Sequence, residues 1–341
     1  MITRLKFRLP DAAETLLNRL IIWSAALLVF AIAAFAVYYY ADQRGSTPAN
    51  ETIMQRQLTL YEQVVRDDPN NITNRLALAD AYYSLQRYSD AIPQYEAALV
   101  INDQSTLANL GLGRAKLGAG DAAGASASFQ WIIDQSKEAD IAGALVQSAY
   151  YYRGSIALDQ QKPDEAIAQL TQAIGIERSD SDAWYLMGTA YIQTGKLDEA
   201  VDALTKAVLF VPNFTDAYEK LAQVYDLKGA RAEALYARGM MAYSLGQLPD
   251  AAKQLEDAVS ASPTLADAYA GLGMVRETQG QRDAALAAYQ QALHLKPDHF
   301  NANSGLARLS GLGSANSPGT ELPANHPGDQ GGDGSQQGVT P

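Results

Sequence analysis

The chain has no cysteine among its 341 residues. This absence excludes disulfides, thiolate metal sites, a cysteine nucleophile and a lipid-anchored N-terminal cysteine. Histidine is almost as scarce, since only His294, His299 and His326 occur. None of the three has a second candidate ligand at helical spacing, so we expect surface histidines, no metal site and no cofactor.

Charged residues are few and unbalanced, at 19% of the chain with a formal net charge of −12. Residues 1–19 carry four basic and two acidic side chains, whereas the remainder carries 22 basic and 36 acidic ones. Nucleic-acid binding needs lysine and arginine to neutralise phosphates. A chain this acidic is therefore not expected to bind nucleic acid.

One long apolar run stands near the N-terminus. Residues 20–41, LIIWSAALLVFAIAAFAVYYYA, are 22 consecutive uncharged residues. At about 1.5 Å per residue, a helix of this length crosses a hydrocarbon core of about 30 Å. Trp23 and the tyrosines at 38–40 are placed as interfacial aromatics, so the run predicts a transmembrane helix. Ala34-Phe35-Ala36 leaves a cleaved signal peptide, and hence a secreted protein, as an alternative, although signal-peptide cores are usually shorter.

The charges beside this run predict its orientation. Four basic residues precede the run, whereas only Arg44 follows it closely. The positive-inside tendency then keeps residues 1–19 in the cytoplasm and places residues 42 onward, beginning with a linker at 42–50, outside a bacterial cell membrane. The alternative is an inverted topology, with a regulatory protein that faces the cytoplasm.

One segment of the sequence occurs twice in similar form. DAWYLMGTAYIQTGKLDEA at 182–200 returns as DAYAGLGMVRETQGQRDAA at 267–285. This segment fits a repeat unit of about 34 residues, a length typical of helix–turn–helix repeats. With Ser181 as position 1 of this unit, position 8 holds glycine or alanine, position 20 holds alanine, and position 24 holds a larger residue.

The sizes at these positions have a physical meaning. Small residues let two helices approach closely, and the larger residue fills the space between them. These larger side chains belong to Tyr95, Phe129, Leu170, Leu204, Leu255 and Tyr289.

This pattern resembles the tetratricopeptide repeat (TPR) family over roughly residues 51–311. The resemblance implies an all-α fold, a TPR α-solenoid in which helix–turn–helix units form a superhelix, here preceded by a single transmembrane helix. We expect a half-unit at 51–71, units at 72–105, 106–139, 147–180 and 181–214, a half-unit at 215–231, units at 232–265 and 266–299, and a capping helix at 300–311.

Two breaks interrupt the period. Residues 140–146 are seven extra positions, which we expect to lengthen a helix. Residues 215–231 are half a unit, and two interpretations stay open: a cap that ends one array, or a continuous superhelix in which the next helix serves both neighbours. Residues 312–341 are rich in glycine and proline and poor in large apolar residues, which predicts a disordered tail.

No catalytic motif is found. GLGRAKLG at 111–118 resembles a phosphate loop, but the repeat register places it inside a helix with no strand before it. We therefore predict a protein that is not an enzyme and has no small-molecule substrate.

The TPR resemblance implies a concave groove lined by positions 2, 5, 9, 12 and 13 of the first helix of each unit. The predicted apolar and aromatic groove residues are Leu76, Tyr83, Tyr151, Tyr185, Ile192, Tyr236, Met240 and Tyr243. The predicted acidic ones are Asp182, Asp216, Glu219 and Glu233. Arg114 is the only basic residue at these positions.

Tyrosines beside carboxylates suit a protein partner with apolar and basic segments. The lysine and asparagine that form the carboxylate clamp of some family members are absent from position 5, which holds leucine, tyrosine or alanine. The sequence thus predicts a non-catalytic, membrane-anchored scaffold or assembly factor that binds peptide or helical segments of other proteins.

Overall fold

The computed structural model describes residues 53–137 and 139–311. The predicted transmembrane helix at 20–41, the segments around it and the tail at 312–341 lie outside these residues. Every regular element in the described part of the chain is an α-helix, fifteen in all. The helices are α2 Ile53–Asp67, α3 Ile72–Ser84, α4 Tyr88–Ile101, α5 Thr106–Gly118, α6 Ala122–Gln135, α7 Gly143–Asp159, α8 Pro163–Ile176, α9 Ser181–Gln193, α10 Leu197–Phe210, α11 Thr215–Leu227, α12 Arg231–Ser244, α13 Leu248–Ala261, α14 Ala266–Thr278, α15 Arg282–Leu295 and α16 Phe300–Leu309.

Membrane crossing needs a long apolar helix. None of the helices between residues 53 and 311 that the structure describes has both the length and the apolar character for it. The expected span at 20–41 is not among the residues described.

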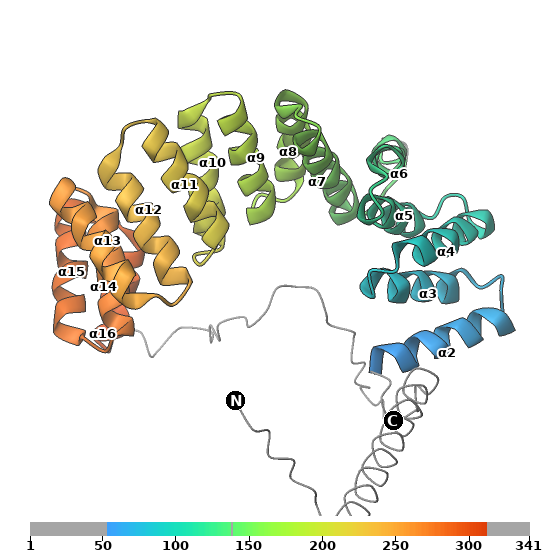
Figure 1. Cartoon of the computed structure of the whole chain (residues 1–341), viewed down its shortest axis with the longest axis horizontal. Helices are drawn as coiled ribbons and strands as arrows, with labels where there is room; N and C mark the ends of the chain where they lie inside the picture. Colours follow the sequence, from blue (N-terminus) through green and yellow to red (C-terminus); the bar gives the residue numbers. More distant parts are fainter. Residues whose placement is uncertain (1–52, 138, 312–341) are drawn as a thin grey trace, which may run out of the picture. The chain divides into compact units, whose positions relative to one another are not determined.

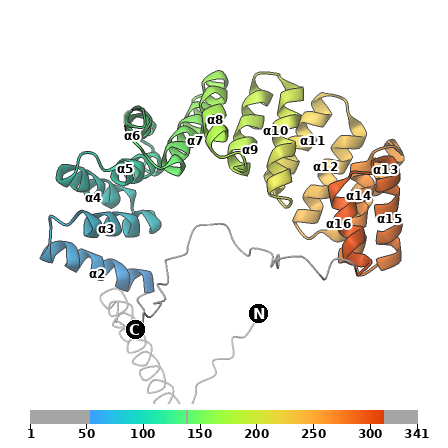
Figure 2. The ribbon, with the colours of Figure 1, turned by 180° about the vertical axis from the view of Figure 1, so that it is seen from behind.

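The chain divides into two compact units, which are considered separately. The N-terminal unit comprises residues up to 125, and its described helices are α2 to α5 with the first turn of α6. The C-terminal unit begins at residue 126 and contains the rest of α6 and helices α7 to α16. Within the C-terminal unit, helices α7 to α16 follow one another side by side in chain order (Figures 1 and 2).

Glycine at position 8 determines how the two helices of a repeat pack. An added Cβ at Gly188 of α9 would lie 2.6 Å from Cγ of Leu204 in α10, and one added at Gly154 would lie at the same distance from Cγ of Leu170. Leu204 is fully buried as a result. The small residue thus makes room for the position 24 side chain of the second helix.

Tyrosine holds position 24 in two repeats, and each ring packs against a glycine of the next first helix. Tyr289 lies between Gly273 of α14 and Gly305 of α16, and an added Cβ at either glycine would overlap its ring. Tyr95 of the N-terminal unit has Gly111 of α5 on one side in the same way. Both tyrosines are almost completely buried.

Two turns lack the usual glycine but keep its conformation. Gln86 after α3 and Gln161 after α7 have φ angles of 57° and 59°. Gly195 after α9 has φ of 72° in the corresponding turn. The turn therefore imposes the left-handed backbone even where a side chain makes it unfavourable.

At the first break in the period, helix α7 has 17 residues, whereas α9 and α11 have 13 each. The extra sequence before it thus extends the first helix of its repeat by about one turn.

At the second break, helix α12 packs against both α11 and α13. One cluster of buried side chains runs from Ala200 through Leu221 and Met240 to Val275. The core of the C-terminal unit is therefore continuous across residues 215–231.

Candidate functional site

Three tyrosines of the C-terminal unit each have a pKa that is raised by burial and by the charge of an aspartate from a later helix. The tyrosine occupies position 5 of one repeat, and the aspartate occupies position 2 of the next repeat. The pairs are Tyr151 with Asp182, Tyr185 with Asp216, and Tyr236 with Asp267. All three tyrosines are half-buried and all three aspartates are exposed. We name them the tyrosine–aspartate pairs.

The first pair joins α7 to α9. Burial raises the pKa of Tyr151, and the negative charges of Asp182 and Asp180 raise it further. The ring of Tyr151 packs edge-on against Tyr152, with 5.3 Å between the ring centroids. Its phenol therefore stays protonated at neutral pH and can donate a hydrogen bond.

The second pair joins α9 to α11. Burial raises the pKa of Tyr185, and Asp216 and Glu219 add to the effect. Phe214, in the turn before α11, packs on the ring at 5.2 Å between centroids. Neither Asp216 nor Glu219 has a hydrogen-bond or ion-pair partner in the chain as far as it is described. Their carboxylates are thus open to a cationic group from outside.

The third pair is more enclosed. Burial raises the pKa of Tyr236 well above its usual value, with smaller contributions from Tyr218 and Asp267. Tyr236 packs against the core cluster of α10 to α14. This tyrosine therefore contributes more to the core than the other two do.

Met240 corrects one expectation. The sequence predicts it as a groove residue, but only 2% of it is exposed. Its sulfur would lie 3.0 Å from a Cβ added at Gly271, so the side chain packs against α14. Met240 therefore belongs to the core cluster of this unit.

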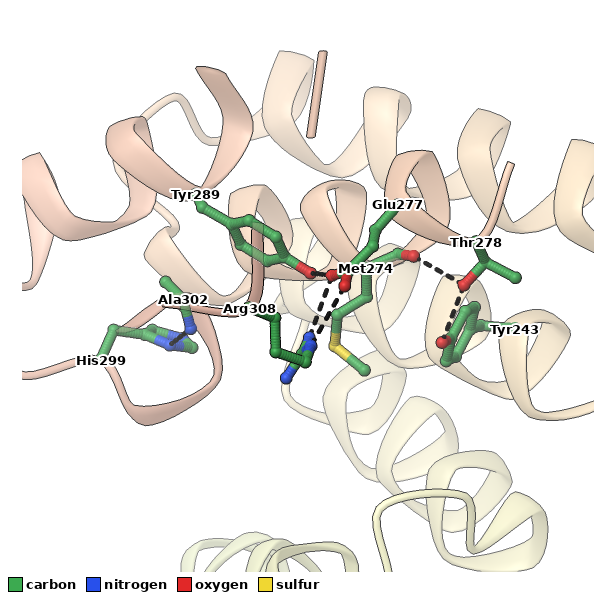
Figure 3. A network of polar contacts seen from close by, with 8 residues as sticks. All are labelled: Tyr243, Met274, Glu277, Thr278, Tyr289, His299, Ala302 and Arg308. Carbon is green, nitrogen blue, oxygen red and sulfur yellow. Dashed lines mark hydrogen bonds and ion pairs between the residues drawn. The ribbon is translucent and has the colours of Figure 1, made fainter. Parts of the chain in front are cut away.

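The remaining predicted residues of this unit lie on the same helices but outside the pairs. Ile192 of α9 is half-buried against the core. Tyr243 of α12 shares a hydrogen bond of 3.2 Å with the hydroxyl of Thr278 (Figure 3). Glu233 is half-buried at the start of α12. Burial raises the pKa of Tyr225, and the negative charges of Asp267 and Glu233 raise it further.

The N-terminal unit holds Leu76 and Tyr83, both on α3 and both half-buried. The guanidinium carbon of Arg114 lies 4.5 Å from the ring centroid of Tyr83. Tyr88 also contacts this ring, at 5.5 Å between centroids. The only basic side chain at a groove position thus covers a face of Tyr83 in a cation–π contact.

Some acidic groove positions are already neutralised within the chain. Glu277 of α14 accepts hydrogen bonds from Nε and Nη2 of Arg308 at 3.1 and 3.0 Å, and from the phenol of Tyr289 at 2.6 Å (Figure 3). In the N-terminal unit, the phenol of Tyr95 donates to Asp80. These carboxylates stabilise the fold and are less open to a partner than Asp216 and Glu219.

His299 is not a surface residue, in contrast to the expectation for all three histidines. It is 6% exposed. Its Nδ1 accepts a hydrogen bond from the backbone N–H of Ala302 and caps α16 (Figure 3), while Nε2 lies 2.9 Å from Oδ1 of Asp267. The ring is buried because it joins the last helix to α14.

The sequence prediction missed Phe214 and the pairing of Tyr236 with Asp267. Phe214 lies in a turn, where repeat positions give no indication of a contact with Tyr185. The pairing could have been found, because the same two repeat positions meet in all three pairs.

Three family models described as tetratricopeptide repeat match the chain. One matches residues 58–106, 110–176 and 212–266, a second matches 157–224, and a third matches 266–299. Together they cover most of the helices described above. The chain matches none of the curated proteins with which it was compared.

Several solved structures of low sequence identity resemble this one. The C-terminal part of a TPR protein from Cytophaga hutchinsonii is 17% identical, with 74% of this chain and 94% of that chain covered and a TM-score of 0.48. YrrB, described as a TPR protein with an unusual peptide-binding site, is also 17% identical, with 72% and 96% covered and a TM-score of 0.37.

A chain of the APC/C hetero-tetramer Cut9–Hcn1 is 14% identical, with a TM-score of 0.42. The match covers 75% of this chain and spans less than half, 46%, of that chain. The glycine and alanine positions, the helix pairs and the family matches agree with one another. The chain therefore belongs to the tetratricopeptide repeat family, whose members are non-catalytic scaffolds for protein–protein interaction.

Proposed function

We propose that this protein is a membrane-anchored scaffold that binds peptide or helical segments of other proteins along the tyrosine–aspartate pairs. The observation that supports this most strongly is the recurrence of the pair on successive repeats. The first two pairs offer an aromatic surface and a hydrogen-bond donor beside a carboxylate, whereas Asp267 of the third pair is bound by His299. Such a row suits a partner segment with apolar side chains and with lysine or arginine, and it disfavours an acidic partner.

The centre of the proposed site is the second pair. Tyr185 is half-buried, and Asp216 and Glu219 are exposed without partners in the described residues. Tyrosine gives a large contact area with few rotatable bonds, so ordering it costs little entropy. The two carboxylates attract a basic side chain at long range and hold it at short range.

Charge reversal tests this site. Asp216→Lys with Glu219→Lys should weaken partner capture by in-membrane crosslinking at least tenfold, because it replaces attraction with repulsion. Glu199→Lys with Asp257→Lys, at exposed positions of α10 and α13, changes the net charge equally and serves as the control. Equal capture by both double variants would contradict the proposed site, provided that their helicity by circular dichroism is unchanged.

The anchor is proposed from residues 20–41 alone. A single span would confine the repeats to the membrane surface and raise their effective concentration near embedded partners. Alkaline extraction should leave the full chain in the membrane fraction. Protease added to cells with a permeabilised outer envelope should digest the repeats. Repeats that stay protected would indicate the inverted topology, and release by alkali would indicate a cleaved leader.

A further inference from the structure

An open cleft lies between α11 and α12, at the second break in the repeat period. Its volume is about 460 Å³, within the roughly 300–1,000 Å³ typical of ligand sites. The lining residues from α11 are Glu219, Ala222, Gln223, Asp226 and Leu227, and those from α12 are Arg238 and Met241. Leu227 is 60% exposed, although it is a large apolar residue.

The repeat register explains the cleft. With Thr215 as position 1, Ala222 stands at position 8 and Arg238 at position 24. In other repeats a buried leucine or aromatic at position 24 packs on position 8, as Leu204 packs on Gly188. Arg238 instead forms an ion pair with Asp226, and 39% of its side chain is exposed. Position 24 is therefore partly exposed here and borders the cleft, whereas the side chain at this position is almost fully buried elsewhere.

The break in the period accounts for the arginine at position 24, where other repeats have leucine or an aromatic residue. Helix α12 is the second helix of the pair with α11 and also packs with α13. An apolar position 24 residue would need a following helix to bury its far side, whereas arginine tolerates exposure there. The half-unit thus leaves an apolar floor, Ala222 and Met241, beneath a charged rim.

We infer that this cleft binds a large apolar side chain of a partner segment, with a lysine or arginine next to it at Glu219. The floor and Leu227 provide the apolar contact. Asp226 and Arg238 neutralise each other, so Glu219 and the nearby Asp216 leave the rim with a negative charge. This inference rests on the proposed function and gives it a specific anchor point.

The test uses random peptides displayed on phage and selected on the purified full chain. Enriched peptides should carry a leucine, methionine or aromatic residue next to lysine or arginine. Leu227→Ser should lower their affinity about tenfold, because it removes the apolar contact. The matched control is Leu245→Ser, since Leu245 is 54% exposed at the end of α12 and does not line the cleft. The Leu245→Ser variant should bind the enriched peptides with the same affinity as the unmodified chain.

A second variant tests the cleft without removing an apolar group. Arg238→Trp should fill the space, because the indole is larger than the arginine side chain, and should abolish binding of the same peptides, while thermal denaturation shows a folded protein. Retained binding in either Leu227→Ser or Arg238→Trp would overturn the inference.

The outcome for Tyr185→Ala separates this inference from the proposed function. If Tyr185→Ala weakens binding and Leu227→Ser does not, the site at the pairs stands and the cleft is rejected. If Leu227→Ser weakens binding and Tyr185→Ala does not, the cleft stands and the pairs are rejected. Enrichment of acidic peptides, or of none, would reject both.

Discussion

The phenol of Tyr289 donates a hydrogen bond of 2.6 Å to Oε2 of Glu277, and Arg308 holds the same carboxylate. Tyr289 comes from α15, Glu277 from α14 and Arg308 from α16, so three helices meet at one charge. The N-terminal unit repeats part of this arrangement with Tyr95 and Asp80. A buried tyrosine at position 24 thus fills the core with its ring and holds an acidic side chain with its hydroxyl.

This contact predicts a pH dependence of stability. Burial raises the pKa of Glu277, but hydrogen bonds from Arg308 and Tyr289 outweigh burial, and its pKa in the folded protein is lowered. Its stabilising contribution is therefore present above the unfolded pKa of about 4.3 and is lost as the pH falls through the folded pKa. We expect Glu277→Gln to reduce the fall in melting temperature below about pH 4. An unchanged pH profile would contradict this.

The glycine at position 8 predicts a strong effect of one methyl group. Gly188→Ala should lower the free energy of unfolding by about 1–3 kcal/mol, because the new Cβ would overlap Leu204. Gly175→Ala is the control, since no atom lies within 4 Å of a Cβ added there. It should raise stability by about 0.5 kcal/mol through helix propensity. Chemical denaturation of both variants measures the difference, and similar changes would contradict the packing argument.

The two glutamine turns predict stabilising substitutions. Gln86→Gly and Gln161→Gly should each raise the free energy of unfolding by about 0.5–1 kcal/mol, because glycine adopts a positive φ without steric cost. Gln279→Gly is the counterpart in a turn where glutamine has φ of −76°. Gln279→Gly should lower the free energy of unfolding, since it adds only chain entropy to the unfolded state. A gain for Gln279→Gly would show that the turn geometry is not the cause.

The exceptional arginine at position 24 predicts a gain of stability on replacement. Arg238→Leu should raise the free energy of unfolding by about 1 kcal/mol, because one side of the leucine would pack on Ala222 and Met241 while its far side stays exposed. Asp226 loses its ion pair but is 51% exposed, so little stability is lost with it. Urea denaturation of the full chain measures the change. A marked destabilisation would mean that the ion pair, and not the repeat register, governs this position.

Much of the fold could be predicted from the sequence because each repeat uses the same residue types at the same positions. Gly188 and Leu204 identify a helix pair through their sizes alone. The groove was harder to predict. Met240 satisfies the positional rule and yet is buried, because Gly271 of α14 leaves room for its side chain against that helix.

Side-chain pairing was outside the reach of the sequence. Glu277 and Asp216 look alike as acidic groove positions, but Arg308 and Tyr289 occupy the first and nothing described in the chain bonds to the second. Likewise, His299 follows a proline turn as a surface residue would, and only its capping bond and Asp267 explain its burial.

The sequence by itself determined the period, the helix pairs and their turns, because these depend on residue size and backbone preference within one repeat. Tertiary structure decided which carboxylates remain available, which tyrosines reach a surface, and where a cleft opens. Those properties depend on contacts between residues of different repeats, and a half-length repeat changes them without changing the local pattern that forms each helix.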